Sequence, residues 1–179
     1  MSRYRRSITG TTYFFTVVAY RRRPIFCDPV IRTNLAQAIR FVRDIRPFAI
    51  DGWVLLPDHM HCIWTLPEPD LDYSTRWAMI KRYVTTGSAR ALHDVALLTP
   101  SRQKHRESTI WQRRFWEHQI RNERDFERHM DYLHFNPVKH GYVNRAADWP
   151  HSTFHRHVRA GAYPHDWGGS IDIDDMAIE

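Results

Sequence analysis

The order of strand-like and helix-like segments restricts the fold of this chain more than any single motif does. β-Branched and aromatic residues gather in runs typical of strands, and elsewhere apolar residues recur at helical spacing. The expected elements are strand, helix, strand, strand, helix, strand and helix, over residues 11–20, 29–46, 48–56, 59–66, 74–92, 113–120 and 122–136. This order predicts an α+β fold of the split βαβ, ferredoxin-like (RRM-like) type, an antiparallel sheet with helices on one face. The same topology also serves RNA-recognition modules, so the fold alone does not identify a function.

The length of 179 residues fits one domain with its own core. We expect this domain to span residues 1–160, with an extra C-terminal helical segment near 149–158. Residues 161–179 are predicted to form an acidic, flexible tail. Pro137 should end the last long helix near Asn136, because the residue before a proline disfavours the α conformation. The polar, basic segment 99–109 is predicted to be a mobile loop.

Cysteine usage and hydropathy favour a cytoplasmic protein. Cys27 and Cys62 are too few for a disulfide framework, which indicates a reducing compartment. The apolar run at residues 13–20 is far shorter than the about 20 residues that a membrane span needs. We therefore expect no membrane partner.

The charge of the chain is basic and carried mainly by arginine. Lys+Arg 26 against Asp+Glu 20 gives +6, but residues 166–179 hold five of the acids and no Lys or Arg. The rest of the chain therefore has 26 basic and 15 acidic residues, a net charge of +11. All the basic residues except Lys81, Lys104 and Lys139 are arginine, whose planar guanidinium binds phosphates and stacks on bases. Nucleic acid is a candidate partner, and a protein bound to DNA in the cytoplasm would associate with the nucleoid. A merely soluble basic surface, or a coding bias towards arginine, explains the composition equally well.

A His-x-His pair lies in the strand expected at residues 59–66. Alternate side chains of a strand share a face, so His59 and His61 should point the same way, about 7 Å apart at their backbones. Met60, Cys62 and Trp64 would take the opposite, apolar face. The pair should then lie on the open face of the sheet, where two imidazoles can converge on a cation. Since the chain has 12 histidines, a chance pair is the alternative.

The helix expected at residues 122–136 carries two stripes at helical spacing. Phe126, Met130 and Leu133 form an apolar stripe, and Tyr132 and Asn136 lie on an adjacent one. A phenol and a carboxamide four residues apart therefore share one face. By themselves, a half-buried packing tyrosine and a helix-ending asparagine explain these residues equally well.

Three blocks of sequence together resemble the REP-associated tyrosine transposases, single-tyrosine HUH endonucleases related to the transposases of the smallest insertion sequences. The blocks are Asp-Tyr-Leu-His-Phe-Asn-Pro-Val-Lys-His-Gly at 131–141, His-Met-His at 59–61 and Trp-Gln-Arg-Arg-Phe-Trp-Glu-His at 111–118. The resemblance extends from the first strand to about Trp149. The Tyr-x-His-x-Asn-Pro-Val-Lys block is the specific part, and the His-x-His pair falls where the family has it.

The resemblance implies a domain that nicks single-stranded DNA beside hairpins of repeated extragenic palindromes (REP elements). His59 and His61 would bind a divalent metal, Mg²⁺ or Mn²⁺, with Asn136 as third ligand; the insertion-sequence relatives commonly have Gln at that position. Tyr132 would attack the scissile phosphate, forming a 5′-phosphotyrosine and releasing a 3′-hydroxyl. The REP-associated group implies a monomer rather than a dimer with shared active sites.

Candidate DNA contacts are basic or aromatic residues in three regions of the sequence. They are Arg3, Arg5 and Arg6 in an N-terminal arm, Arg21, Arg22 and Arg23 after the first strand, and Arg113, Arg114, Trp111 and Trp116 before and within the fourth. Two other functions remain open: a hairpin-binding module without productive cleavage, and a metallohydrolase that activates water while Tyr132 is only structural.

Overall fold

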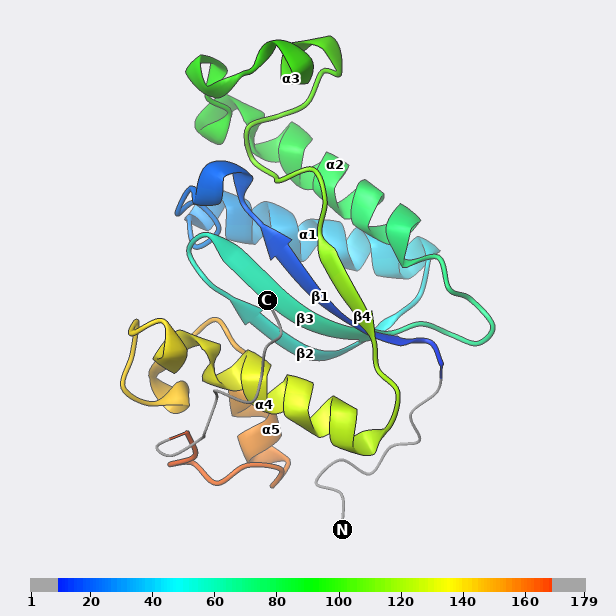
Figure 1. Cartoon of the computed structure of the whole chain (residues 1–179), viewed down its shortest axis with the longest axis vertical. Helices are drawn as coiled ribbons and strands as arrows, with labels where there is room; N and C mark the ends of the chain where they lie inside the picture. Colours follow the sequence, from blue (N-terminus) through cyan, green and yellow to red (C-terminus); the bar gives the residue numbers. More distant parts are fainter. Residues whose placement is uncertain (1–9, 169–179) are drawn as a thin grey trace.

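Four strands form one sheet in the order β2-β3-β1-β4, and every neighbouring pair is antiparallel. The computed structural model describes residues 10–168. The strands are β1 (Thr12–Val18), β2 (Ala49–Leu55), β3 (His59–Thr65) and β4 (Trp116–Gln119) (Figure 1). Because one helix connects β1 to β2 and another connects β3 to β4, this is the split βαβ topology. The predicted α+β class and its split βαβ topology are therefore confirmed.

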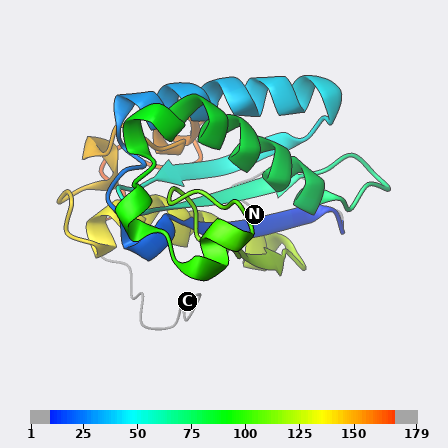
Figure 2. The same ribbon diagram turned by 90° about the horizontal axis from the view of Figure 1, so that it is seen from above.

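The helices α1 (Pro29–Ile45) and α2 (Tyr73–Leu92) pack side by side against one face of the sheet (Figure 2). Asp28 begins α1 by accepting a hydrogen bond from the Val30 amide, and Pro29 occupies the first helical position. Trp64 of β3 and Trp77 of α2 stack with ring centroids 4.3 Å apart. This layer is the larger core of the molecule.

The helix α4 (Glu123–Lys139) covers the other face of the sheet, which the sequence predicts to be open. Phe126, Met130 and Leu133 form the predicted apolar stripe, and they pack against Phe14 and Ile63 of the sheet. Figure 2 shows the sheet between the α1–α2 layer and α4. The apolar stripe of a helix shows which side of the helix is buried, but not which face of the sheet that side packs against. The prediction that all helices lie on one face of the sheet is therefore corrected: α4 lies on the other face.

The helix α4 begins where the sequence predicts but ends later than predicted. Asn122 caps the helix by accepting a hydrogen bond from the Asp125 amide. The helix continues past Pro137 to Lys139, three residues beyond the predicted end. The Asn136 and Pro137 carbonyls accept hydrogen bonds from His140 and Tyr142, so the last turn is satisfied although Pro137 lacks an N–H group.

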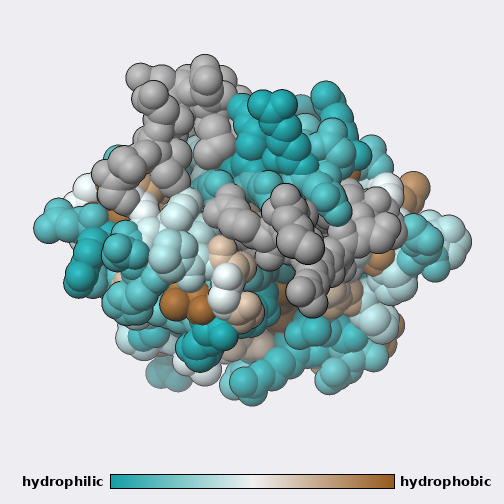
Figure 3. All heavy atoms as spheres, turned by 90° about the horizontal axis from the view of Figure 1, so that it is seen from below, coloured by the Kyte–Doolittle hydropathy of each residue, from teal (hydrophilic) through white to brown (hydrophobic). Residues whose placement is uncertain are grey.

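The C-terminal segment protects the exposed edge of β2. The Thr153 amide donates to the Trp53 carbonyl, and the Leu55 amide donates to the His151 carbonyl. A short helix, α5 (Phe154–Arg159), follows. Tyr163 and Trp167 pack with Phe154, so the folded part extends to Trp167 rather than ending at residue 160. Residues 169–179 of the predicted tail lie outside the described residues. The surface of the described residues, seen from below, is mainly hydrophilic (Figure 3).

The segment predicted to be a mobile loop contains the short helix α3 (Pro100–Lys104). Arg102 is buried there, and its guanidinium donates to the carbonyls of Ser108 and Trp111. These buried hydrogen bonds explain why the segment is folded despite its polar composition. Within residues 10–168, no helix has both the length and the hydrophobicity that spanning a membrane requires.

Leu133→Ala tests the packing of α4 on the sheet. Leu133 is fully buried, so the truncation should lower the free energy of unfolding by about 2–5 kcal/mol, measured by urea titration. Arg124→Ala, at an exposed position of the same helix, is the control and should change it by less than about 0.5 kcal/mol. Equal stabilities of the two variants would contradict this placement of α4.

His157→Gln tests the pH dependence of stability. Burial, followed by the nearby Arg156 charge, lowers the pKa of His157 to about 4, while its Nε2 lies 2.9 Å from the Asp51 carbonyl oxygen. The unfolded chain binds the proton near pH 6.5 and the folded chain only near pH 4, so stability falls as the pH drops through this window. In the variant, the free energy of unfolding should decrease less steeply as the pH drops. The slopes of the two proteins should differ by less than about 1.4 kcal/mol per pH unit, the limit for one proton. Urea midpoints at several pH values between 7 and 4 measure the slope, and an unchanged slope would be the contrary result.

Candidate active site

The two histidines of β3 share one face of the sheet, as the period of the strand predicts. Their ring centroids are 5.0 Å apart, while Met60, Cys62 and Trp64 point into the opposite core. The side chains are not on an open face: His59 is 1% and His61 is 0% exposed, because α4 lies over them. Two imidazoles are therefore held in a protected site at the start of β3.

Hydrogen bonds orient His59. Its Nδ1 lies 2.7 Å from Asp58 Oδ1, and its Nε2 lies 3.3 Å from Asn136 Oδ1. When the neutral ring carries its proton on Nδ1 and donates to the carboxylate, Nε2 presents a lone pair to an oxygen that also presents one. A cation would satisfy both atoms. The Asp58 carboxylate is suited to accept this proton, since burial alone would raise its pKa but the hydrogen bond with His59 and the nearby Arg22 lower it.

His61 offers a second nitrogen to the same site. Its Nδ1 lies 2.9 Å from Thr16 Oγ1, and its buried Nε2 has no hydrogen-bond partner among the residues that the structure describes. Burial holds the pKa of His61 well below its usual range, and nearby His59, His140 and Lys139 act in the same direction. The ring is therefore neutral near pH 7 and has a lone pair available for a metal ion.

The helix α4 brings Tyr132 and Asn136 to the histidines. The ring centroids of Tyr132 and His61 are 5.3 Å apart, and both Tyr132 and Asn136 are buried. Tyr132 and Asn136 are four residues apart, so the phenol and the amide lie on the same face of the helix, as the sequence predicts. His59, His61, Tyr132 and Asn136, the four residues chosen from the sequence, thus meet at one place.

Two further residues of this site follow the tyrosine and were not chosen from the sequence. Lys139 Nζ donates to the Tyr132 hydroxyl at 3.5 Å and lies 4.9 Å from the centre of its ring. The ring of His140 is 5.0 Å from that of His59. The sequence signal for these two residues is the Pro-Val-Lys-His run after Asn136. Lys139 and His140 follow Tyr132 by about two helical turns, a spacing that puts them on the same side of the helix as the tyrosine.

The arginines after β1 divide into two structural groups. Arg21 and Arg22 have positive φ angles of 55° and 51° and project from a short 3-10 turn, Tyr20–Arg22, beside the site. Arg22 forms an ion pair with Asp58 at 3.2 Å, so the turn contacts the carboxylate that orients His59. Arg23 instead donates to the carbonyls of Leu92 and Thr109, which is a structural use of its guanidinium.

The remaining candidate DNA contacts also separate by exposure. Trp111 is only 5% exposed and donates its indole N–H to Thr85, so it cannot stack on a base. Trp116, in contrast, is 44% exposed on the edge strand β4. Arg113 is paired with Glu107, and Arg114 is exposed. Arg3, Arg5 and Arg6 lie outside the described residues.

Comparisons with known proteins give one family. A REP-associated tyrosine transposase of Escherichia coli (strain K12) is 48% identical over 172 residues, which cover 96% of this chain and 93% of the relative. A putative REP-associated tyrosine transposase of Haemophilus influenzae (strain ATCC 51907 / DSM 11121 / KW20 / Rd) is 44% identical over 174 residues, 97% of each chain. No protein-family model matches the chain.

A solved structure, that of a REP-associated tyrosine transposase bound to a REP hairpin, is similar throughout. It has a TM-score of 0.74 and 47% sequence identity, with 95% of this chain and 93% of that chain covered. Identity at this level over nearly the whole length extends to both the sheet and α4. The chain therefore belongs to the REP-associated tyrosine transposases.

Proposed function

We propose that this chain is a metal-dependent single-stranded DNA endonuclease and strand transferase that acts beside REP-type hairpins through Tyr132. The observation that carries the proposal is the meeting of Tyr132, His59, His61 and Asn136 in one buried site. The relative solved with a REP hairpin supports hairpin DNA as the substrate class. The protein would work on cytoplasmic, nucleoid-associated DNA and as a monomer, since all four residues come from one chain.

The residues present fit a divalent cation. His59 Nε2, the unpartnered His61 Nε2 and Asn136 Oδ1 supply two imidazole nitrogens and an amide oxygen, a set compatible with Mn²⁺ or Mg²⁺. When bound, such an ion would withdraw negative charge from the scissile phosphate and orient it. Asp58 would keep the proton of His59 on Nδ1 and so keep Nε2 available.

Tyr132 is the proposed nucleophile. Its oxygen would form a bond to phosphorus while the bond from phosphorus to the 3′-oxygen breaks, leaving a 5′-phosphotyrosine and a free 3′-hydroxyl. The phenol proton is lost and the leaving oxygen gains one. Because a free phenol has a pKa near 10, ionising it at pH 7 costs about 4 kcal/mol. The Lys139 ammonium, 3.5 Å away, would lower this cost by stabilising the phenolate.

The bond energy of the cut strand would be retained in the phosphotyrosine, so rejoining would need no nucleotide cofactor. Tyr132 is 1% exposed, so a phosphate reaches its oxygen only after the groups covering it move apart. Arg21, Arg22 and Arg114 would bind phosphates of the strand, and the exposed ring of Trp116 would stack on a base. Arg23 and Trp111 would not contact the DNA, because their polar groups form hydrogen bonds within the protein.

Tyr132→Phe is the decisive variant. It removes only the nucleophilic oxygen, so it should abolish covalent adduct formation and lower cleavage by at least about 1000-fold, with hairpin binding retained. The assay mixes protein with labelled hairpin DNA and Mn²⁺, followed by denaturing electrophoresis and mass spectrometry, with a chelator as a second control. Tyr142→Phe removes the phenol oxygen of a partly exposed tyrosine and should cleave normally.

The outcomes separate the alternatives. An adduct that maps to Tyr132 and disappears with chelator supports the proposal. Cleavage without an adduct, retained in Tyr132→Phe, would instead identify a metallohydrolase that activates water. Hairpin binding with neither adduct nor cleavage, in both Mg²⁺ and Mn²⁺, would identify a hairpin-binding module.

Asn136→Ala tests the third ligand. The variant loses one oxygen of the proposed set and should raise the Mn²⁺ concentration for half-maximal cleavage by at least about 10-fold. Asn144→Ala, an exposed asparagine beyond the end of α4, is the matched control. If both variants have the Mn²⁺ dependence of the parent protein, Asn136 is not a ligand.

A further inference from the structure

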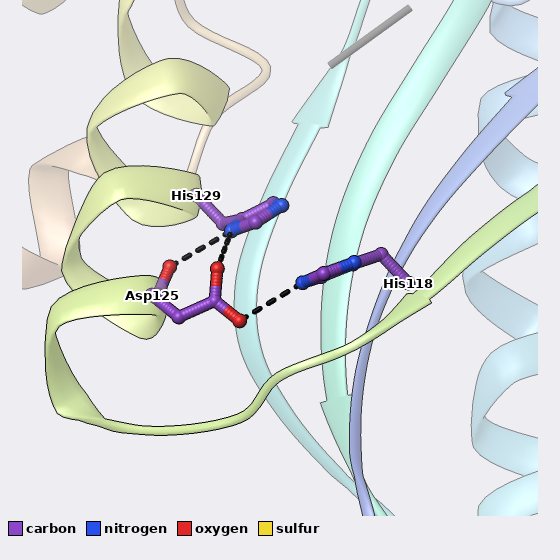
Figure 4. Close-up of side chains that lie close together, drawn as sticks. All are labelled: His118, Asp125 and His129. Atoms are coloured by element: carbon purple, nitrogen blue, oxygen red, sulfur yellow. Dashed lines mark hydrogen bonds and ion pairs between the residues drawn. The ribbon is translucent and has the colours of Figure 1, made fainter. Parts of the chain in front are cut away.

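A second group of metal-ligating side chains joins the edge strand to the helix that carries the tyrosine. His118 comes from β4, whereas Asp125 and His129 lie one helical turn apart at the start of α4 (Figure 4). His118 Nε2 is 2.9 Å from Asp125 Oδ2, and His129 Nδ1 is 3.1 Å from Asp125 Oδ1. One ligand atom from each residue lies within 4.8 Å of the other two.

Surrounding contacts hold the three side chains in place. Asp125 Oδ2 also accepts a hydrogen bond from the Arg121 amide, and the Asp125 amide donates to the helix cap Asn122. The rings of His118 and His129 stack, with centroids 4.6 Å apart and planes 13° from parallel. Both imidazoles therefore present their edges to one carboxylate, as Figure 4 shows.

The donor types suit a cation. The Asp125 carboxylate supplies two oxygens, and each histidine turns one ring nitrogen towards it. His129 Nδ1 also donates to the Asp125 backbone carbonyl at 2.8 Å, a hydrogen bond that a bound ion would replace. The cluster therefore combines one carboxylate with two ring nitrogens that can coordinate a metal.

We propose that His118, Asp125 and His129 form a second metal site, which binds a transition-metal ion of the Zn²⁺ class. Two imidazoles and one carboxylate are a common Zn²⁺ ligand set that leaves a position for water. The side chains of His118 and Asp125 are 21% and 19% exposed, so an ion and its water can enter from solvent. The ion would replace the ring N–H groups that face Asp125, with each ring's proton held on its other nitrogen.

This site is separate from the proposed catalytic one. The phenyl ring of Phe14 lies between them, 4.9 Å from the ring of His129 and 5.4 Å from that of His61. The ion would link β4 directly to α4, one turn before Tyr132, and so fix the helix against the sheet. The proposal does not depend on the chemistry assigned to Tyr132, His59 or His61.

The test measures Zn²⁺ binding to the full chain in the background His59→Gln/His61→Gln, in which the proposed catalytic ligands are absent. After removal of metals with a chelator, calorimetric titration should give one Zn²⁺ per chain. Co²⁺ should give the visible absorption of a site with nitrogen and oxygen ligands. Zn²⁺ at 100-fold excess over the dissociation constant should raise the melting temperature by about 5–10 °C.

Adding Asp125→Asn should weaken Zn²⁺ binding by more than about 100-fold, because the charged ligand is lost. Glu123→Gln is the matched control: it removes an exposed acid from the same first turn of α4 and should bind like the background protein. If Asp125→Asn does not fold, His118→Gln decides, since this residue lies on β4 and outside the helix. Absence of binding, or equal affinity in the ligand variant and the Glu123 control, overturns the proposal.

Discussion

The packing of α4 on the sheet is the contact on which the site depends. Phe126, Met130 and Leu133 are buried between the helix and the strands, and they fix both the rotation and the height of α4. Gly52 of β2 allows this close approach, since a Cβ atom there would lie 2.6 Å from Met130 Sδ and 3.2 Å from Leu133 Cδ1. With the helix seated in this way, the neighbouring stripe that holds Tyr132 and Asn136 must face the histidines of β3.

The same packing has a cost for the polar groups that it encloses. His61 Nε2 and Asn136 Nδ2 are buried without a hydrogen-bond partner among the described residues. An unsatisfied buried polar atom costs about 1–3 kcal/mol, and a protein keeps such groups where a ligand or a reaction uses them. The apolar stripe of α4 supplies the stability that offsets this cost, so packing and function are divided between two faces of one helix.

Local periodicity accounts for what the sequence predicted correctly. The alternation of β3 put His59 and His61 on one face, and the helical spacing of α4 put Tyr132 beside Asn136; both depend only on backbone geometry. The sheet face that α4 covers depends on tertiary packing, and so do the exposures of Trp111 and Trp116. The two tryptophans look alike in the sequence, yet one fills the core against Phe26 and the other is exposed on an edge strand. The positions of Lys139 and His140 likewise depend on where α4 ends, so periodicity alone does not predict that they lie in the site.

A chain of contacts leads from the surface to the buried site. Arg22 is paired with Asp58, whose other oxygen binds His59, whose second nitrogen faces Asn136. The turn that begins this chain is held in an unfavourable form, since a left-handed conformation costs about 1–2 kcal/mol at a residue other than glycine. Hydrogen bonds from the Ala19 amide to the Asp58 carbonyl and from the Tyr20 amide to the Ile110 carbonyl hold it there. Because Asp58 divides its two oxygens between Arg22 and His59, any change in the Arg22 pair alters the electrostatic surroundings of a ring that itself cannot reach solvent.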